Sequence, residues 1–332
     1  MPGSEPTRGE SALIFPESVE IVEVSPRDGL QSLSKVYTTD QKVGLVEHLL
    51  AAGLQRIEVT SFVRPDVIPA LADAEDLFRR LPDPGSCTYR ALVPNRKGAQ
   101  RAADVGLREV VGLICVSEAY NLKNQNMSVD RNVEVIGEIV EVAATSDVHV
   151  VVAVAMTMFC AYEGDIPLER SMALIGRIVD LGVDEIYVAT SAGADGPRKV
   201  FELCSSVRET YPDLKVGIHL HNTNGMALAN ALAAMQAGVR TFEGALCGIG
   251  GGIRFPHLTG NHGNLCTEDL VNMLTECGID TGVSWDKLLD ASAYLSESFG
   301  VASGSHAAAG ATKEHMLEMA RLNPWAGGLV GG

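Results

Sequence analysis

The chain has 332 residues, of which 46% are hydrophobic and 20% are charged, and its formal net charge is −16. This composition excludes a wholly disordered protein, and the acidic balance argues against partners with a phosphate backbone and against an anionic membrane surface. The seven cysteines form no C-x-x-C pair, and the most apolar window, Val148–Phe159, is too short to cross a bilayer. We therefore expect a reduced cytoplasmic protein that binds neither nucleic acid nor membranes.

Short apolar runs rich in β-branched residues alternate with helix-like stretches along most of the chain. The runs are Val19–Val24, Arg56–Phe62, Thr88–Val93, Glu109–Ser117, Val148–Met158, Glu185–Thr190, Val216–His221 and Thr241–Gly250. This alternation is typical of parallel strands with right-handed helical crossovers. Eight successive units predict an α/β fold, the closed (β/α)8 TIM barrel, and an open sheet built from the same elements is the alternative.

Helix signals lie between these runs and beyond the last of them. Thr38 and Gln41 form a capping-box pattern ahead of an apolar stripe, which predicts a helix start. We predict a disordered tail at 1–16, a TIM-barrel catalytic domain at 17–280, and a helical extension packed on the barrel at 281–332, with helices over Trp285–Phe299 and Ala311–Leu322.

Polar residues of metal-binding type gather where the predicted strands end, which is the active-site end of such a barrel. His219 and His221 stand two apart in a strand, so both imidazoles face the barrel interior. Asp28 follows the first strand, close to the seventh in a closed barrel, and Asn264 in the last loop offers an amide oxygen. These ligands suit an octahedral divalent ion, Mg²⁺ or Mn²⁺ rather than Zn²⁺, because no thiolate is among them.

Two charged residues adjoin this expected metal centre. Arg27 precedes Asp28, and a guanidinium there is placed to hold an oxygen on which negative charge develops during a reaction. Glu58 stands in an apolar strand, where an unpaired carboxylate would be costly, so we expect it either to pair with Arg27 or to carry a proton.

Several motifs in order resemble those of the 3-hydroxy-3-methylglutaryl-CoA lyase family, metal-dependent TIM-barrel enzymes that cleave carbon–carbon bonds. They extend over roughly residues 18 to 280: Ser25-Pro-Arg-Asp-Gly-Leu-Gln31, Ile57-Glu-Val-Thr-Ser-Phe62, Ser117-Glu118, Tyr162-Glu-Gly164, the H-x-H strand, and Gly263-Asn-Leu-Cys-Thr-Glu-Asp269.

The resemblance implies a retro-aldol cleavage of 3-hydroxy-3-methylglutaryl-CoA, or a related 3-hydroxyacyl-CoA, to an acyl-CoA and a keto acid. It assigns Asp28, His219, His221 and Asn264 to the metal, Arg27 to the enolate, and Glu58 to a partner role; it also implies a homo-oligomer. Gln31 and Glu268 match residues on the substrate side, and Thr190 stands where the family carries an aspartate, so we expect all three to bind substrate.

The chain also departs from the family. Gly252 stands where the lyases have a reactive cysteine, and Cys247, five residues earlier, is expected to be a buried apolar residue. The loop that follows is longer and contains His257 and His262, either of which can take over proton transfer because imidazole titrates near neutral pH. An exposed loop histidine with no catalytic role is the alternative for each.

Three other functions remain open at this point: an aldolase for a 4-hydroxy-2-oxo acid, a Claisen-type synthase on the same metal site, and a noncatalytic relative. The intact Arg27 and metal ligands count against the last. Candidate cations for the phosphates of coenzyme A are Arg64, Arg96, Lys97, Lys123 and Arg254.

Overall fold

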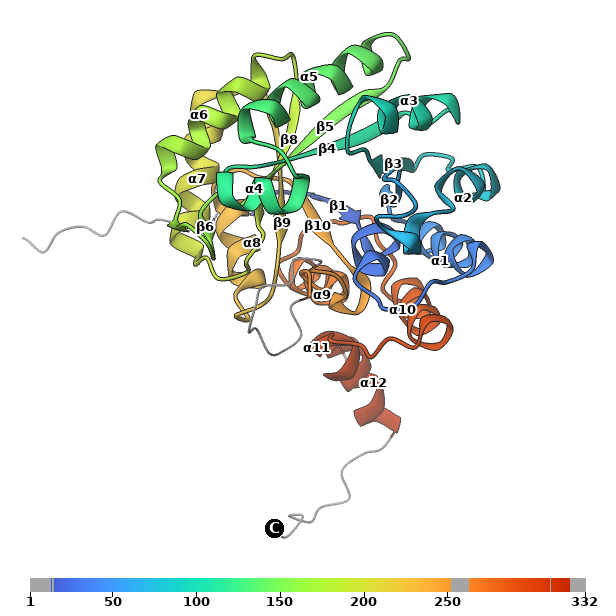
Figure 1. Cartoon of the computed structure of the whole chain (residues 1–332). Helices are drawn as coiled ribbons and strands as arrows, with labels where there is room; N and C mark the ends of the chain where they lie inside the picture. Colours follow the sequence, from blue (N-terminus) through green and yellow to red (C-terminus); the bar gives the residue numbers. More distant parts are fainter. Residues whose placement is uncertain (1–12, 14, 252–262, 311, 323–332) are drawn as a thin grey trace, which may run out of the picture.

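A computed structural model describes residues 13, 15–251, 263–310 and 312–322. Eight parallel strands close into a barrel in the order β1-β10-β9-β8-β5-β4-β3-β2, and helices surround it (Figure 1). The strands are β1 (Glu20–Glu23), β2 (Arg56–Ser61), β3 (Thr88–Leu92), β4 (Glu109–Cys115), β5 (His149–Ala155), β8 (Glu185–Thr190), β9 (Lys215–Leu220) and β10 (Thr241–Gly244). Each lies within a predicted run or overlaps it closely, so the TIM-barrel prediction is confirmed.

The helices follow the strands as the alternation predicts. They are α1 (Thr39–Ala51), α2 (Ala74–Arg80), α3 (Arg96–Asp104), α4 (Glu118–Gln125), α5 (Val129–Ala144), α6 (Leu168–Val179), α7 (Pro197–Thr210), α8 (Ala227–Gln236), α9 (Thr267–Glu276), α10 (Trp285–Phe299), α11 (His306–Gly310) and α12 (Lys313–Leu322). The capping box of α1 is present in both directions, because the Thr38 side chain accepts from the Gln41 backbone and the Gln41 side chain accepts from the Thr38 backbone.

The structure differs from the sequence expectation at two strand ends. The last run ends as a strand at Gly244 and continues as the short 3₁₀ helix η3 (Leu246–Gly248), in which Cys247 has a positive φ of 59°. The fifth run ends at Ala155 and leads into the small hairpin β6 (Phe159–Cys160) and β7 (Gly164–Asp165). Both irregular segments follow the carboxyl ends of barrel strands, where loops rather than packing set the local backbone.

The barrel has an apolar outer layer and a charged interior. Side chains between the strands and the helices, such as Ile57 and Val59 of β2, form a continuous buried hydrophobic core. Inside the barrel, ion pairs cross from strand to strand. Arg56 binds Glu185, and the fully buried Arg90 binds two carboxylates nearer the carboxyl ends of the strands. Charged groups removed from water are tolerated only when they are paired and hydrogen-bonded, so the interior is an organised network.

The segment after the barrel begins with α10, which lies along α1. The Gln41 side chain donates to the Ser298 carbonyl at 2.7 Å, and the rings of His48 and Tyr294 stack with centroids 4.3 Å apart. The described helices include none that is long and apolar enough to cross a membrane.

Glu23 is a fully buried carboxylate that ties β1 to the segment after β10. Its Oε1 accepts from the Ser25 and Leu246 backbone N–H groups at 2.9 and 3.0 Å, and its Oε2 accepts from the Thr267 hydroxyl at 2.6 Å. Burial raises the pKa of Glu23 to about 7, against the lowering effect of these hydrogen bonds. Folding therefore favours the protonated carboxyl, whose contribution to stability is present at acidic pH and is lost as the pH rises through about 7.

Replacing Glu23 with Gln should remove this pH dependence, since the Gln oxygen can accept the two backbone bonds and its amide can donate to Thr267. When the pH rises from 5 to 8, the parent protein loses stability that Glu23→Gln keeps. We expect the melting temperature of the variant minus that of the parent to increase by on the order of 5 °C over this range. Thermal unfolding followed by circular dichroism at both pH values measures this difference. Parallel pH profiles for the two proteins would contradict it.

Candidate active site

Asp28 lies at the mouth of the barrel in the π-helical turn η1 (Ser25–Gly29), which directly follows β1. Because β1 pairs with β10 to close the barrel, only β10 separates the first strand from β9, which carries His219 and ends one residue before His221. Asp28 is 8% exposed, and its Oδ2 accepts from the Asn264 side chain at 2.7 Å. Residues more than 230 positions apart in the chain therefore meet at this point.

His219 and His221 point to the same side, as their spacing in β9 predicts. Their Nε2 atoms are 2.9 Å apart. The Nδ1 of His219 lies 2.6 Å from Glu243 Oε2. Since an ionised carboxylate only accepts, Nδ1 of His219 donates to Glu243. Burial by itself would lower the pKa of His219, but the hydrogen bond and charge of Glu243 outweigh it and raise that pKa. Burial lowers the pKa of His221 to about 3, aided by the neighbouring His219, which keeps this imidazole in its neutral, ligating form.

Asn264 is fixed by a short bridge to the end of β9. Its backbone pairs with His221, and its side chain is 2% exposed. The Nδ2 atom donates to Asp28, whereas the buried Oδ1 atom has no hydrogen-bond partner in the described structure. A Cβ on Gly250, which has a φ of +110°, would collide with this amide and with Asp28, so glycine keeps the space open.

These residues fit a divalent cation. One ligand atom each from Asp28, His219 and His221 lie within 4.8 Å of one another, and the unpartnered oxygen of Asn264 adjoins them. A buried acceptor with no donor is costly unless a cation or water satisfies it. The donor set of imidazole nitrogen, carboxylate oxygen and amide oxygen matches an ion of the Mg²⁺ or Mn²⁺ type.

Arg27 and Glu58 form an ion pair beside this centre, as the sequence led us to expect. Arg27 Nη1 also donates to Asp28 Oδ1 at 2.7 Å, so its guanidinium bridges the two carboxylates. Burial by itself would raise the pKa of Asp28, but the positive charge of Arg27 outweighs it and holds that pKa well below its usual range. Asp28 is therefore ionised at any physiological pH, and the Arg27 side chain is 12% exposed.

Comparison with known proteins identifies the family. The family model described as HMGL-like matches residues 18–295. The chain belongs to the HMGL-like family. The resemblance inferred from the motifs is thereby confirmed.

The HMGL-like relatives cover nearly the whole barrel. A hydroxymethylglutaryl-CoA lyase of Bacillus subtilis is 34% identical over 286 residues, which are 86% of this chain and 95% of that protein. The mitochondrial hydroxymethylglutaryl-CoA lyase of Bos taurus is 37% identical over 281 residues, 85% of this chain and 86% of that one. The structure of an HMG-CoA lyase from Acinetobacter baumannii, in complex with coenzyme A and 3-methylmalate, has a TM-score of 0.84 and 36% identity, and covers 90% of this chain and 97% of that one.

Within this HMGL-like site, two residues expected to bind substrate have no exposed surface. Thr190 accepts from the His221 backbone at 3.4 Å. Glu268 lies behind η3, where both its oxygens accept from the Cys247 backbone N–H and one accepts from the Ser292 hydroxyl at 2.6 Å. Each side chain holds backbone near the site, and direct contact of Thr190 and Glu268 with substrate stays a prediction.

The other expected site residues have different outcomes. Gln31 follows η1 and is partly exposed. His257 and His262 lie outside the described residues, as does Arg254. Of the candidate phosphate-binding cations, Arg64 and Arg96 already form exposed ion pairs with Asp66 and Glu141, Lys123 lies 4.8 Å above the Tyr162 ring, and Lys97 is exposed.

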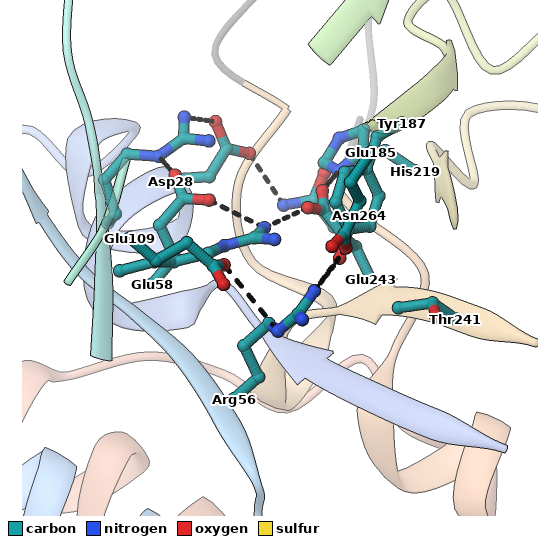
Figure 2. A network of polar contacts seen from close by, with 12 residues as sticks. Asp28, Arg56, Glu58, Glu109, Glu185, Tyr187, His219, Thr241, Glu243 and Asn264 are labelled. Atoms are coloured by element: carbon teal, nitrogen blue, oxygen red, sulfur yellow. Dashed lines mark hydrogen bonds and ion pairs between the residues drawn. The ribbon is translucent and has the colours of Figure 1, made fainter. Parts of the chain in front are cut away.

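Sequence reasoning did not identify Arg90 and Glu243. Arg90 is fully buried in β3, and one of its nitrogens binds both Glu58, at 2.8 Å, and Glu243. Figure 2 shows Glu58, Glu243 and His219 joined in one network with Asp28 and Asn264. The signal was present, since each is a lone charge within an apolar strand, the same pattern that drew attention to Glu58.

Replacing Asn264 with Leu should weaken metal binding, because the variant lacks both the unpartnered oxygen and the donor to Asp28. Manganese at 100 times its dissociation constant should stabilise the parent protein by about 2.7 kcal/mol. A loss of affinity of about tenfold or more removes at least about 1.4 kcal/mol of that gain. The measurement is the difference in melting temperature between manganese and EDTA.

Asn222→Leu is the matched control. Asn222 adjoins His221, but its side-chain oxygen is already used, accepting from the Ala227 backbone at 3.1 Å. We expect this variant to melt lower in both manganese and EDTA and to keep the full difference between them. An undiminished manganese gain in Asn264→Leu would show that the amide oxygen is not a ligand.

Proposed function

We propose that this chain is a divalent-metal-dependent carbon–carbon lyase that cleaves 3-hydroxy-3-methylglutaryl-CoA, or a closely related 3-hydroxyacyl-CoA, by a retro-aldol reaction. The observation that carries the proposal is the convergence of Asp28, His219, His221 and Asn264 next to an inward-facing arginine in a chain of the HMGL-like family. The alignments with the relatives named hydroxymethylglutaryl-CoA lyase span 95% and 86% of the length of those proteins. This supports the same reaction type here.

Retro-aldol cleavage requires removal of a proton from a tertiary hydroxyl and stabilisation of the negative charge that forms when the carbon–carbon bond breaks. A bound divalent ion would supply the Lewis acidity that lowers the pKa of that hydroxyl. Among the protein's own groups, Arg27 is the cation placed to stabilise the developing charge, since its guanidinium is fixed between Asp28 and Glu58 and is partly open to the mouth. Glu58 orients Arg27. The Glu58 side chain is fully buried, so its ion pairs account for its presence without direct contact with substrate.

The substrate class rests on the acyl-CoA chemistry of the relatives. The Acinetobacter baumannii lyase was solved with coenzyme A and a small hydroxy diacid, 3-methylmalate. A polyanionic cofactor needs only a local group of cations, so the net charge of −16 does not oppose it. We propose an acyl-CoA substrate for this chain and, as the sequence predicts, a homo-oligomer in the cytoplasm.

The test of this function is a cleavage assay with a panel of 3-hydroxyacyl-CoAs and 4-hydroxy-2-oxo acids, each with Mg²⁺, with Mn²⁺ and with EDTA. We expect metal-dependent release of a keto acid and an acyl-CoA from 3-hydroxy-3-methylglutaryl-CoA or a close analogue, identified by mass spectrometry. Turnover of the oxo acids alone would replace the proposal with an aldolase, and condensation without cleavage would replace it with a synthase.

The resembled lyases use a reactive cysteine for proton transfer. In this chain Gly252 stands at the matching position. We propose that His257 or His262 performs the proton transfer here, since both stand shortly before the proposed metal ligand Asn264 in the sequence.

Replacing each histidine with Gln in turn should lower kcat about 10²–10⁴-fold for the residue that transfers the proton. The variant of the other histidine is its control and should retain activity. Steady-state kinetics on the best substrate of the panel measures both. If both variants keep the parental kcat, neither histidine is the proton carrier.

A further inference from the structure

Arg90 occupies a junction inside the barrel beneath the metal site. Its side chain is fully buried in β3, and its Nη2 atom donates to Glu58 Oε2 at 2.8 Å and also to Glu243 Oε1 on β10. The guanidinium lies 4.8 Å above the centre of the Tyr187 ring, which further limits its movement. An added Cβ on Gly217 would overlap that ring, so the position is kept free for it.

The two carboxylates that Arg90 binds use their remaining oxygens at the site itself. Glu58 Oε1 binds Arg27, the cation proposed to stabilise developing charge. Glu243 Oε2 accepts from Nδ1 of His219, a proposed metal ligand. Among the described residues, Arg90 alone therefore forms ion pairs with both Glu58, the partner of Arg27, and Glu243, the partner of His219.

We propose that Arg90 is a positioning residue of the metal centre: through Glu243 it sets the orientation of His219, and through Glu58 it sets that of Arg27. This inference rests on the metal-dependent function proposed above and assigns to that site a residue that touches neither metal nor substrate.

The physical reason is the cost of leaving two carboxylates in the barrel without the cation between them. Removing one partner of a buried ion pair exposes the other to an uncompensated desolvation cost and, here, to repulsion between Glu58 and Glu243. The carboxylates would then turn apart or take up water. His219 would lose the fixed acceptor that orients its ring, and its Nε2 would no longer be held 2.9 Å from that of His221.

The barrel offers a matched control at its opposite end. Arg56 of β2 is also an interior arginine, and it binds Glu185 along with Glu20 and Glu109. It forms no ion pair with Glu58 or Glu243, the two carboxylates that Arg90 binds, although both arginines contact Tyr187. Substituting either arginine removes a guanidinium from the same barrel, but only Arg90 is joined to the metal-site residues.

The experiment compares Arg90→Met and Arg56→Met in the full-length protein. Mn²⁺ dissociation constants are measured by isothermal titration calorimetry, and melting temperatures are measured in EDTA. Both variants should melt lower than the parent. Arg90→Met should bind Mn²⁺ about 10–100-fold more weakly. Arg56→Met should stay within about twofold of the parent, because Arg56 forms no ion pair with Glu58 or Glu243.

A conservative variant separates charge from geometry and guards against misfolding. Arg90→Lys keeps one positive charge but not the planar guanidinium, so its Mn²⁺ affinity should lie between those of the parent and Arg90→Met. Where Arg90→Met yields no folded protein, Arg90→Lys against Arg56→Lys decides, with weaker binding expected only for the former.

The outcomes distinguish the two proposals. Equal Mn²⁺ affinity in the parent and in the folded Arg90 variants overturns the positioning role and leaves the proposed lyase intact. An equal loss of affinity in the Arg90 and Arg56 variants assigns the effect to general destabilisation and also overturns it. A parent protein that binds no Mn²⁺ removes the metal-dependent function together with this inference.

Discussion

The need to neutralise two carboxylates inside the barrel governs how this site is built. The side chains of Glu58 and Glu243 are 1% and 6% exposed, and removing two carboxylates from water is costly without close cationic partners. Arg90 supplies the shared positive charge between them. An aliphatic barrel interior would satisfy packing equally well, so the charged interior requires another explanation, and its connection to the metal-site residues provides one.

Negative and positive side chains alternate along this network, which runs from the mouth into the barrel interior and back to the site. From Asp28 the contacts run to Arg27, then to Glu58, Arg90 and Glu243, and end at His219. Each carboxylate in the middle uses its two oxygens for two different partners, which fixes its orientation more firmly than a single ion pair would. Glu58, Arg90, Glu243 and His219 come from barrel strands, so the hydrogen bonding of the sheet holds them, and Arg27 and Asp28 come from the turn η1 that follows β1.

The sequence was sufficient for the parts of the structure that depend on local pattern. The apolar runs located all eight barrel strands, and the spacing of His219 and His221 in one strand predicted that they share a face. It was insufficient for partners that only strand register brings together. Arg90 and Glu243 lie 153 positions apart and meet across the barrel, so neither could be paired with the other before the fold was known. The buried position of Glu268 was missed because the turn after β10 is not regular.

Gly252 stands where the resemblance places the reactive cysteine of the lyases, whereas the proposed metal ligands are all present. All seven cysteines are among the described residues, and six are buried, while Cys277 is partly exposed near the end of α9. Cys247, closest in sequence to the vacant position, is fully buried, and burial together with the nearby Glu268 raises its pKa. A buried thiol with a raised pKa is a poor proton carrier at neutral pH. The burial of Cys247 therefore agrees with the proposal that an imidazole, from His257 or His262, transfers the proton.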